Sequence, residues 1–263
     1  MKIRIVVLMS LLLIGISGWA QPETDSSKII KILTFNIYHG ATMNGDFDLD
    51  LIARVISDTD PDLVALQEVD FKTRRARGYD LATELGWRLK MAPVFARAML
   101  YDGGEYGEGI LSDYSYISTR NVPLPFTGSN EPRTVIEVFT ALPSGDTICF
   151  AGTHFDHKEA NNDRILQARR VNEVFAHSPY PTILAGDLNA VPGSVPIMML
   201  EEVWGSSYDR LDPAPTYPSG HPDKKIDYVM FYPKDRWRVI SSEVIRDTIA
   251  SDHCAYLVVL ELL

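Results

Sequence analysis

Polar side chains stand at the ends of five short apolar runs, and this arrangement restricts the fold more than any other feature of the chain. The runs have the length of single strands and are rich in β-branched and aromatic residues, which favour strands. The polar residues at or beside their ends are Asn36, Glu68, His154, Asp187 and the pair Asp252-His253. Loops at strand ends carry the binding and catalytic side chains of open α/β sheets. We therefore expect an α/β fold in which one edge of the sheets collects these residues into a site.

Hairpin and helix signals occur in the same chain, which narrows the fold class further. A turn sequence at 143–145 separates the expected strands 134–141 and 146–152, and such a hairpin does not occur in a purely parallel sheet. Apolar residues at helical spacing predict helices over 48–58 and 160–177, which a simple β-sandwich lacks. Further strands are expected at 31–37, 63–69, 88–96, 182–185, 225–232 and 255–262, a helix at 79–85, and a long loop at 206–223. The prediction is one domain with two packed mixed β-sheets flanked by helices, a four-layer α/β/β/α sandwich.

The first 20 residues have a different character from the rest of the chain. Lys2 and Arg4 precede an apolar run from Ile5 to Ile16, and small residues follow at Gly18 and Ala20. This pattern predicts a secretory signal peptide. The alternative is an uncleaved membrane anchor, but the run is shorter than the roughly 20 residues that span a bilayer. We expect a signal peptide at 1–20, a flexible mature N-terminus at 21–29 and a catalytic domain at 30–263. The mature protein would be secreted or periplasmic, with no stable membrane span after cleavage.

The charge of the chain bears on the kind of partner it can bind. The 263 residues include 35 acidic and 25 Lys or Arg residues, which gives a formal net charge of −10. Affinity for a nucleic-acid backbone depends largely on Lys and Arg contacts to phosphates. A long nucleic acid is therefore a less expected substrate than a small phosphoester. Nothing in the composition indicates an obligate assembly, and we expect a monomer.

The chain has two cysteines, Cys149 and Cys254. Export would permit a disulfide between them. Both lie in apolar stretches, however, and a buried free thiol behaves as a small hydrophobic side chain. We favour two free thiols, although spacing alone leaves a Cys149–Cys254 disulfide open.

Six short motifs occur in an order that resembles the endonuclease/exonuclease/phosphatase superfamily, which has the deoxyribonuclease-I-like fold. They are Thr34-Phe-Asn-Ile37, Leu66-Gln-Glu-Val69, Gly152-Thr-His154, Gly186-Asp-Leu-Asn189, Ile226-Asp-Tyr228 and Ser251-Asp-His253. Each motif alone is weak, but all six lie at expected strand ends, and the resemblance covers residues 30–262. It implies a phosphoric ester hydrolase that requires Mg²⁺ or Mn²⁺.

The resemblance places a metal ion at Glu68. Hard divalent cations prefer oxygen ligands, of which the protein usually supplies few. Asn36 would support the metal through its carbonyl oxygen or bind the phosphate through its amide nitrogen. Asp252 would be a second carboxylate on the metal side. Whether one metal or two are used stays open.

The catalytic residues predicted from the same motifs are Asp187, Asn189, His154, Asp227 and His253. Asp187 would deprotonate the attacking water, and Asn189 would hold Asp187 and donate to the phosphoryl oxygen. His253, kept protonated by Asp227, would stabilise negative charge on the phosphoryl group, and His154 would donate from the opposite side.

Substrate contacts are expected from Arg164 and His39. Arg74, Arg75 and Arg133 are further candidates for binding a second anionic group. The middle motif Tyr106-Gly-Glu-Gly-Ile-Leu-Ser-Asp113 departs from the family pattern, because Glu108 replaces the usual Asn and Asp113 the usual Arg. These two changes put the usual substrate contacts there in doubt.

The predicted function is hydrolysis of a phosphate mono- or diester by in-line attack of activated water, on a small molecule or a lipid headgroup. The alternatives are a secreted nuclease of the same fold, a catalytically inactive binding module, and a zinc hydrolase built on His154 and His157. The zinc alternative lacks the further ligands of a structural site. Asp156 stands at the position that the resemblance gives to a family acid near the site.

Overall fold

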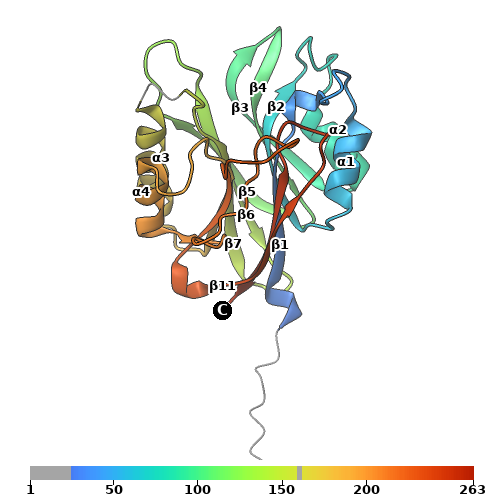
Figure 1. The fold of residues 1–263 in the computed structure, drawn as a ribbon. Helices are drawn as coiled ribbons and strands as arrows, with labels where there is room; N and C mark the ends of the chain where they lie inside the picture. The colour runs from blue at the N-terminus through green and yellow to red at the C-terminus, as the bar shows by residue number, and fades with distance from the viewer. Residues whose placement is uncertain (1–24, 159–161) are drawn as a thin grey trace, which may run out of the picture.

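Two mixed six-stranded sheets pack face to face, and helices cover their outer faces (Figure 1). The computed structural model describes residues 25–158 and 162–263. The first sheet has the order β11-β12-β1-β2-β4-β3, with β1 Ile29–Asn36, β2 Leu63–Phe71, β3 Ala92–Tyr101, β4 Gly104–Ser112, β11 Trp237–Ile245 and β12 Ala255–Leu262. The second has the order β5-β6-β7-β8-β10-β9, with β5 Tyr116–Leu124, β6 Arg133–Ala141, β7 Thr147–His154, β8 Thr182–Asp187, β9 Gly205–Ser206 and β10 Asp227–Tyr232. The predicted four-layer α/β/β/α sandwich is confirmed.

The helices complete the outer layers. They are α1 Leu49–Ser57, α2 Leu81–Leu89, α3 Asp163–Phe175 and α4 Val195–Val203, with short 3₁₀ helices η1 Ser26–Lys28, η2 Tyr38–Gly40 and η3 Lys234–Arg236. In Figure 1, α1 and α2 lie on one side of the sandwich and α3 and α4 on the other. Asp48 caps α1 by accepting hydrogen bonds from the backbone N–H groups of Asp50 and Leu51.

Side-chain alternation along β1 shows how the layers are held together. Ile30 and Ile32 belong to the core between the two sheets, whereas Leu33 and Phe35 pack with α1 and α2 in a second apolar cluster. All four side chains are at most 1% exposed. Successive residues of a strand point to opposite faces, so a central strand buried on both faces is apolar along most of its length.

Parallel strand pairs bring the polar strand ends to one edge of the sandwich. β1 pairs in parallel with β2, and β7 pairs in parallel with β8. The chain passes through α1 and α3, respectively, between the two strands of each pair. The carboxyl ends of β1, β2, β7 and β8 therefore open in the same direction, as the sequence pattern predicted.

Several expected boundaries were wrong. The predicted strand 88–96 begins only at Ala92, because α2 continues to Leu89 and ends where Lys90 adopts a left-handed conformation (φ 60°). β11 was not predicted, because polar residues interrupt the apolar ones in this edge strand, most of which is exposed. Within the expected flexible segment 21–29, residues Ser26–Lys28 form η1 and Ile29 begins β1. The predicted signal peptide at 1–20 lies outside the described residues.

Cys149 and Cys254 are both free and buried, as favoured from the sequence. Among residues 25–158 and 162–263, no helix is long and apolar enough to cross a membrane.

The contact between β7 and β8 requires a glycine directly before Asp187. A Cβ atom on Gly186 would lie 1.9 Å from the carbonyl oxygen of Thr153. We expect Gly186→Ala to lower the free energy of unfolding by about 1–3 kcal/mol or more, because the two strands must move apart. Chemical denaturation monitored by circular dichroism measures this change. Gly220→Ala is the matched control: nothing lies within 4 Å of its added Cβ, and we expect a change below about 0.5 kcal/mol. Equal stabilities of the two variants would contradict this account.

Candidate active site

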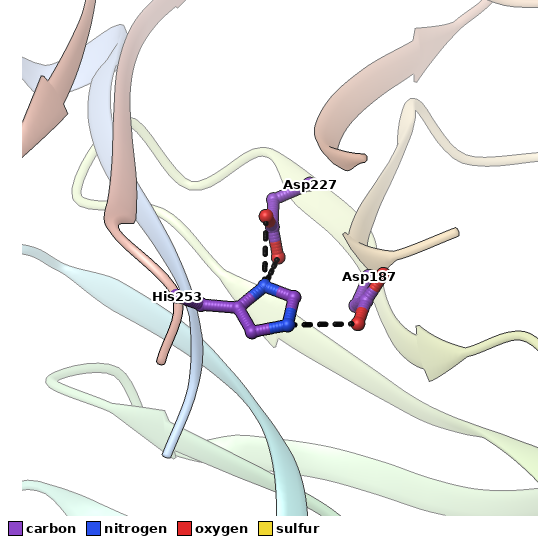
Figure 2. A group of neighbouring side chains, drawn as sticks. All are labelled: Asp187, Asp227 and His253. Carbon is purple, nitrogen blue, oxygen red and sulfur yellow. Dashed lines mark hydrogen bonds and ion pairs between the residues drawn. The ribbon is translucent and has the colours of Figure 1, made fainter. Parts of the chain in front are cut away.

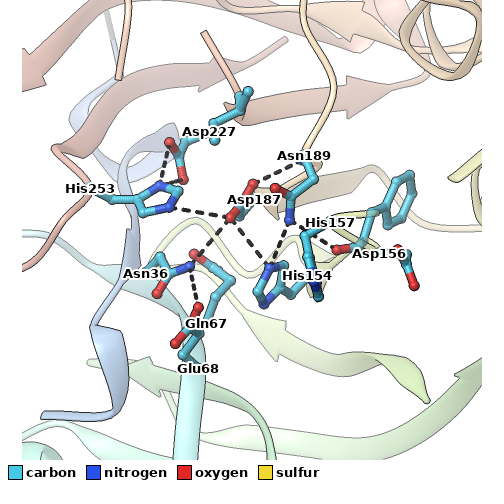
Figure 3. A network of polar contacts seen from close by, with 12 residues as sticks. Asn36, Gln67, Glu68, His154, Asp156, His157, Asp187, Asn189, Asp227 and His253 are labelled. Atoms are coloured by element: carbon cyan, nitrogen blue, oxygen red, sulfur yellow. Dashed lines mark hydrogen bonds and ion pairs between the residues drawn. The ribbon is translucent and has the colours of Figure 1, made fainter. Parts of the chain in front are cut away.

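The predicted site residues meet at the edge of the sandwich where the strand ends open (Figure 3). Strand register explains the meeting. His154 lies opposite Asp187 in the β7–β8 pair, and Asp187 lies opposite Asp227 in the β8–β10 pair. Asn36 and Glu68 come from the other sheet, and His253 from the turn before β12. Both sheets therefore contribute to one cleft with a volume of 670 Å³.

His253 lies between two carboxylates (Figure 2). Its Nδ1 is 3.1 Å from Asp227 Oδ2 and 3.2 Å from Asp227 Oδ1, and its Nε2 is 3.6 Å from Asp187 Oδ2. Burial alone would lower the pKa of His253, but the negative charges of Asp227 and Asp187 outweigh burial and raise the pKa to about 10. His253 is therefore a fixed cation at neutral pH.

Asp187 is a buried carboxylate at the meeting point of the two sheets. It is 1% exposed, and burial raises its pKa, although the His253 cation and hydrogen bonds oppose that rise. The backbone N–H of Asn189 donates to Asp187 Oδ1 at 2.9 Å, and Asn36 Nδ2 donates to Oδ2 at 3.3 Å. These contacts hold a carboxylate that is more basic than an exposed Asp, which suits proton abstraction near neutral pH.

Asn36 connects Asp187 to Glu68 across the two sheets. Its Nδ2 also donates to Glu68 Oε1 at 3.3 Å, while its Oδ1 accepts from the backbone N–H of Tyr38 at 3.1 Å. His39 Nδ1 lies 3.4 Å from Glu68 Oε2. Burial would raise the pKa of Glu68, but the hydrogen bonds from His39 and Asn36 outweigh burial and lower it. Glu68 is therefore ionised.

A bulge in β2 turns Glu68 toward the cleft. The register of β2 with β4 shifts between Leu66 and Val69, and Glu68 has a φ of 57°. Such bulges commonly reorient a side chain next to a functional site. Asp252 lies beside the same cleft, and burial raises its pKa.

The donor set fits a hard divalent cation. Glu68 is an ionised, partly accessible carboxylate, and Asp252 adds a second carboxylate nearby. A separate group of atoms from Asp187, Asp227 and His253 also lies within 4.8 Å of one another. In that group, His253 Nδ1 already contacts both oxygens of Asp227, and the catalytic roles of the three residues stay predictions. The assignments of Glu68, Asn36 and Asp252 as metal ligands stay predictions.

His154 is neutral and is held from both sides. Arg133 Nη1 lies 3.0 Å from its Nδ1, and Asn189 Nδ2 lies 2.9 Å from its Nε2. Burial and, after it, the Arg133 charge lower the pKa of His154 well below its ordinary value. Arg133 also places Nη2 3.3 Å from His157 Nδ1. A guanidinium therefore contacts both rings, which argues against a zinc site built on His154 and His157.

The remaining sequence candidates take different positions. Arg164 lines the cleft and donates to the backbone oxygen of Asn189, and His39 contacts Glu68. Asp156 is buried and accepts from the backbone N–H of Lys158 at 2.6 Å. Glu108 is buried against the Arg133 charge.

Tyr217 and Lys224 line the cleft but are not among the site residues predicted from the sequence. Tyr217 lies against the His253 ring with 4.7 Å between ring centroids. Tyr217 lies in the expected loop 206–223 and Lys224 directly follows it. No periodic pattern in this segment predicts which side chains reach the cleft. Their closeness in sequence to Asp227 was the only available signal.

Comparison with known proteins agrees with this geometry. The Endonuclease/Exonuclease/phosphatase family profile matches residues 33–253, and the chain belongs to this family. Proteins of the family are generally phosphoric ester hydrolases that use a divalent metal.

Three solved structures illustrate the likeness in fold. An endonuclease/exonuclease/phosphatase from Beutenbergia cavernae is 22% identical (TM-score 0.71) and is aligned over 89% of this chain and 72% of its own. The mannosyl-6-phosphatase of Bacteroides thetaiotaomicron is 17% identical (TM-score 0.71) and is aligned over 88% of this chain and 99% of its own. The human Nocturnin catalytic domain with bound sulfate is 18% identical (TM-score 0.69) and is aligned over 90% of this chain and 95% of its own. At these identities the likeness establishes the fold alone.

The charge of His253 can be tested without an activity assay. Histidine NMR titration should show that the ring stays protonated through pH 8. In Asp227→Asn the pKa of His253 should fall toward or below the ordinary value of about 6.5, because the closest opposing charge is lost. The raised pKa stabilises the folded state fully below about pH 6.5, and this stabilisation is lost as pH rises through about 10. Asp235→Asn, at an exposed position, should leave the titration unchanged. A wild-type His253 that titrates near pH 6.5 would refute the assignment.

Proposed function

We propose that the protein is an exported, Mg²⁺- or Mn²⁺-dependent phosphoesterase that hydrolyses a phosphate mono- or diester of a small molecule or lipid headgroup. The proposal rests on three groups that lie in one cleft. They are the buried, basic carboxylate of Asp187, the protonated imidazole of His253 and the ionised carboxylate of Glu68. Together they match the needs of water activation, charge stabilisation and cation binding.

The residues divide the reaction between them. Asp187 accepts the proton of the attacking water while Asn36 and the Asn189 backbone hold its carboxylate in place. His253 provides positive charge for the phosphoryl oxygens as negative charge develops on them. The Asn189 amide, beside His154, contributes neutral hydrogen-bonding groups from the other side. Glu68, with Asp252 and Asn36, would hold the metal, which supplies Lewis-acid stabilisation of the phosphoryl group when bound.

The cleft supports a small substrate. A volume of 670 Å³ lies in the range of pockets that enclose small molecules. One protein of the same fold is a mannosyl-6-phosphatase. The formal net charge of −10 favours a compact phosphoester over a long nucleic acid.

The catalytic assignment predicts a specific loss of turnover. With bis(p-nitrophenyl) phosphate and p-nitrophenyl phosphate as substrates, turnover should vanish in EDTA and return with Mg²⁺ or Mn²⁺. Asp187→Asn should fold normally and lose about 10²–10³-fold or more in kcat, because it cannot accept the proton. Asp212→Asn changes an exposed carboxylate and should retain full activity. Substantial turnover by folded Asp187→Asn would overturn the role of this residue, and absence of turnover in the wild type with both esters and every metal would favour the inactive binding module.

Export is tested separately. The apolar run from Ile5 to Ile16 and the small residues at Gly18 and Ala20 support cleavage after Ala20. Expression of the full chain in a Gram-negative host should yield a periplasmic or secreted product whose N-terminal sequence begins at Gln21. Replacing Leu11 and Leu12 by Arg should abolish processing, whereas Leu211→Arg, far from the N-terminus, should not. An unprocessed, membrane-bound wild type would contradict the signal peptide.

A further inference from the structure

Two cations that line the cleft lack a carboxylate partner among the described residues. Arg164, at the start of α3, and Lys224, just before β10, both line the cleft. Within residues 25–158 and 162–263, neither makes an ion pair with a carboxylate. Arg164 donates through Nη1 to the backbone oxygen of Asn189. A guanidinium has five N–H donors, so most of its binding capacity remains available.

The three other arginines suggested by the sequence each make an ion pair with a carboxylate. Arg75 makes a two-point ion pair with Asp70, at 2.7 Å from Nε to Oδ2 and 2.9 Å from Nη2 to Oδ1. Arg74 pairs with Asp102 at 2.8 Å. Arg133 pairs with Glu131 at 2.9 Å and also contacts His154. The three arginines that the sequence offered for a second anionic group are thus held by acids of the protein.

Hydrogen bonds connect the backbone near both cations to the loop that carries Asn189. Arg164 donates to the carbonyl oxygen of Asn189. The Tyr228 hydroxyl lies 2.8 Å from the carbonyl oxygen of Ala190 and 3.0 Å from that of Lys225, the residue after Lys224. Arg164 and Lys224 therefore add two positive charges to a cleft that Glu68, Asp187 and Asp252 also line.

We propose that Arg164 and Lys224 form a subsite for a second anionic group of the substrate, a phosphate or a carboxylate. The inference rests on the proposed function and narrows its substrate class to small phosphoesters that carry such a group beyond the scissile phosphate. Arginine offers a planar fork that matches these anions, and lysine adds a mobile point charge. In a chain of formal net charge −10, an anionic ligand gives these two cations the partner that the protein does not supply.

Binding of a matched pair of probes tests the subsite without turnover. Glucose 1,6-bisphosphate and glucose 6-phosphate differ only in the second phosphate. Calorimetry with the full chain in EDTA should show the bisphosphate bound at least about tenfold more tightly, with a difference that shrinks in high salt. Arg164→Gln/Lys224→Gln should reduce the difference to below about twofold. The double variant Arg169→Gln/Lys90→Gln carries the same change in net charge at exposed positions. It should keep the wild-type difference in affinity between the two probes.

The outcomes separate the subsite from the catalytic proposal. Equal affinity of the wild type for both probes, or an unchanged difference in folded Arg164→Gln/Lys224→Gln, would overturn the subsite even if esters are hydrolysed. A preference that is lost in this variant would support the subsite even if no ester is turned over. Because Arg164 holds the Asn189 backbone, the single variant Lys224→Gln at an exposed position provides a second test and should lose part of the preference.

Discussion

The pairing register of β8 with its two neighbours is the constraint on which the site depends. It sets His154, Asp187 and Asp227 side by side on three adjacent strands. A shift of one residue would turn these side chains to the opposite face of the sheet and replace them with apolar neighbours. The close approach of Gly186 to Thr153 belongs to the same register. Backbone pairing in the second sheet thus determines the catalytic geometry before any side-chain contact does.

Environment gives chemically similar residues different tasks. Asp187 and Glu68 are both carboxylates joined by Asn36, yet burial raises the pKa of the first and hydrogen bonds lower that of the second. His253 and His154 are both buried, but two carboxylates raise the pKa of His253, whereas burial and, after it, the charge of Arg133 lower the pKa of His154. Pairs of titratable groups whose pKa values are driven apart by their surroundings are typical of sites where one group acts as an acid and the other as a base.

The central strands and the residues at their ends could be predicted from the sequence, because mostly apolar runs mark the strands and six short motifs in order mark their ends. The edge strand β11 and the boundary between α2 and β3 were not predicted. Polar residues interrupt the apolar ones in β11, and the boundary depends on one left-handed residue. The contact of Arg133 with both His154 and His157 joins parts of the chain more than 20 residues apart, so local pattern gave no sign of it. Tyr217 and Lys224 lie in irregular segments, where position follows from tertiary packing alone.

Asn36 links a carboxylate of one sheet to a carboxylate of the other. The distances within the site therefore depend on how the two sheets are aligned. The layer of side chains between the sheets, which includes Ile110 and Phe150, sets that alignment from a distance. A substitution in this layer that changes the separation of the sheets would also change the separation of Glu68 and Asp187, even where the protein stays folded.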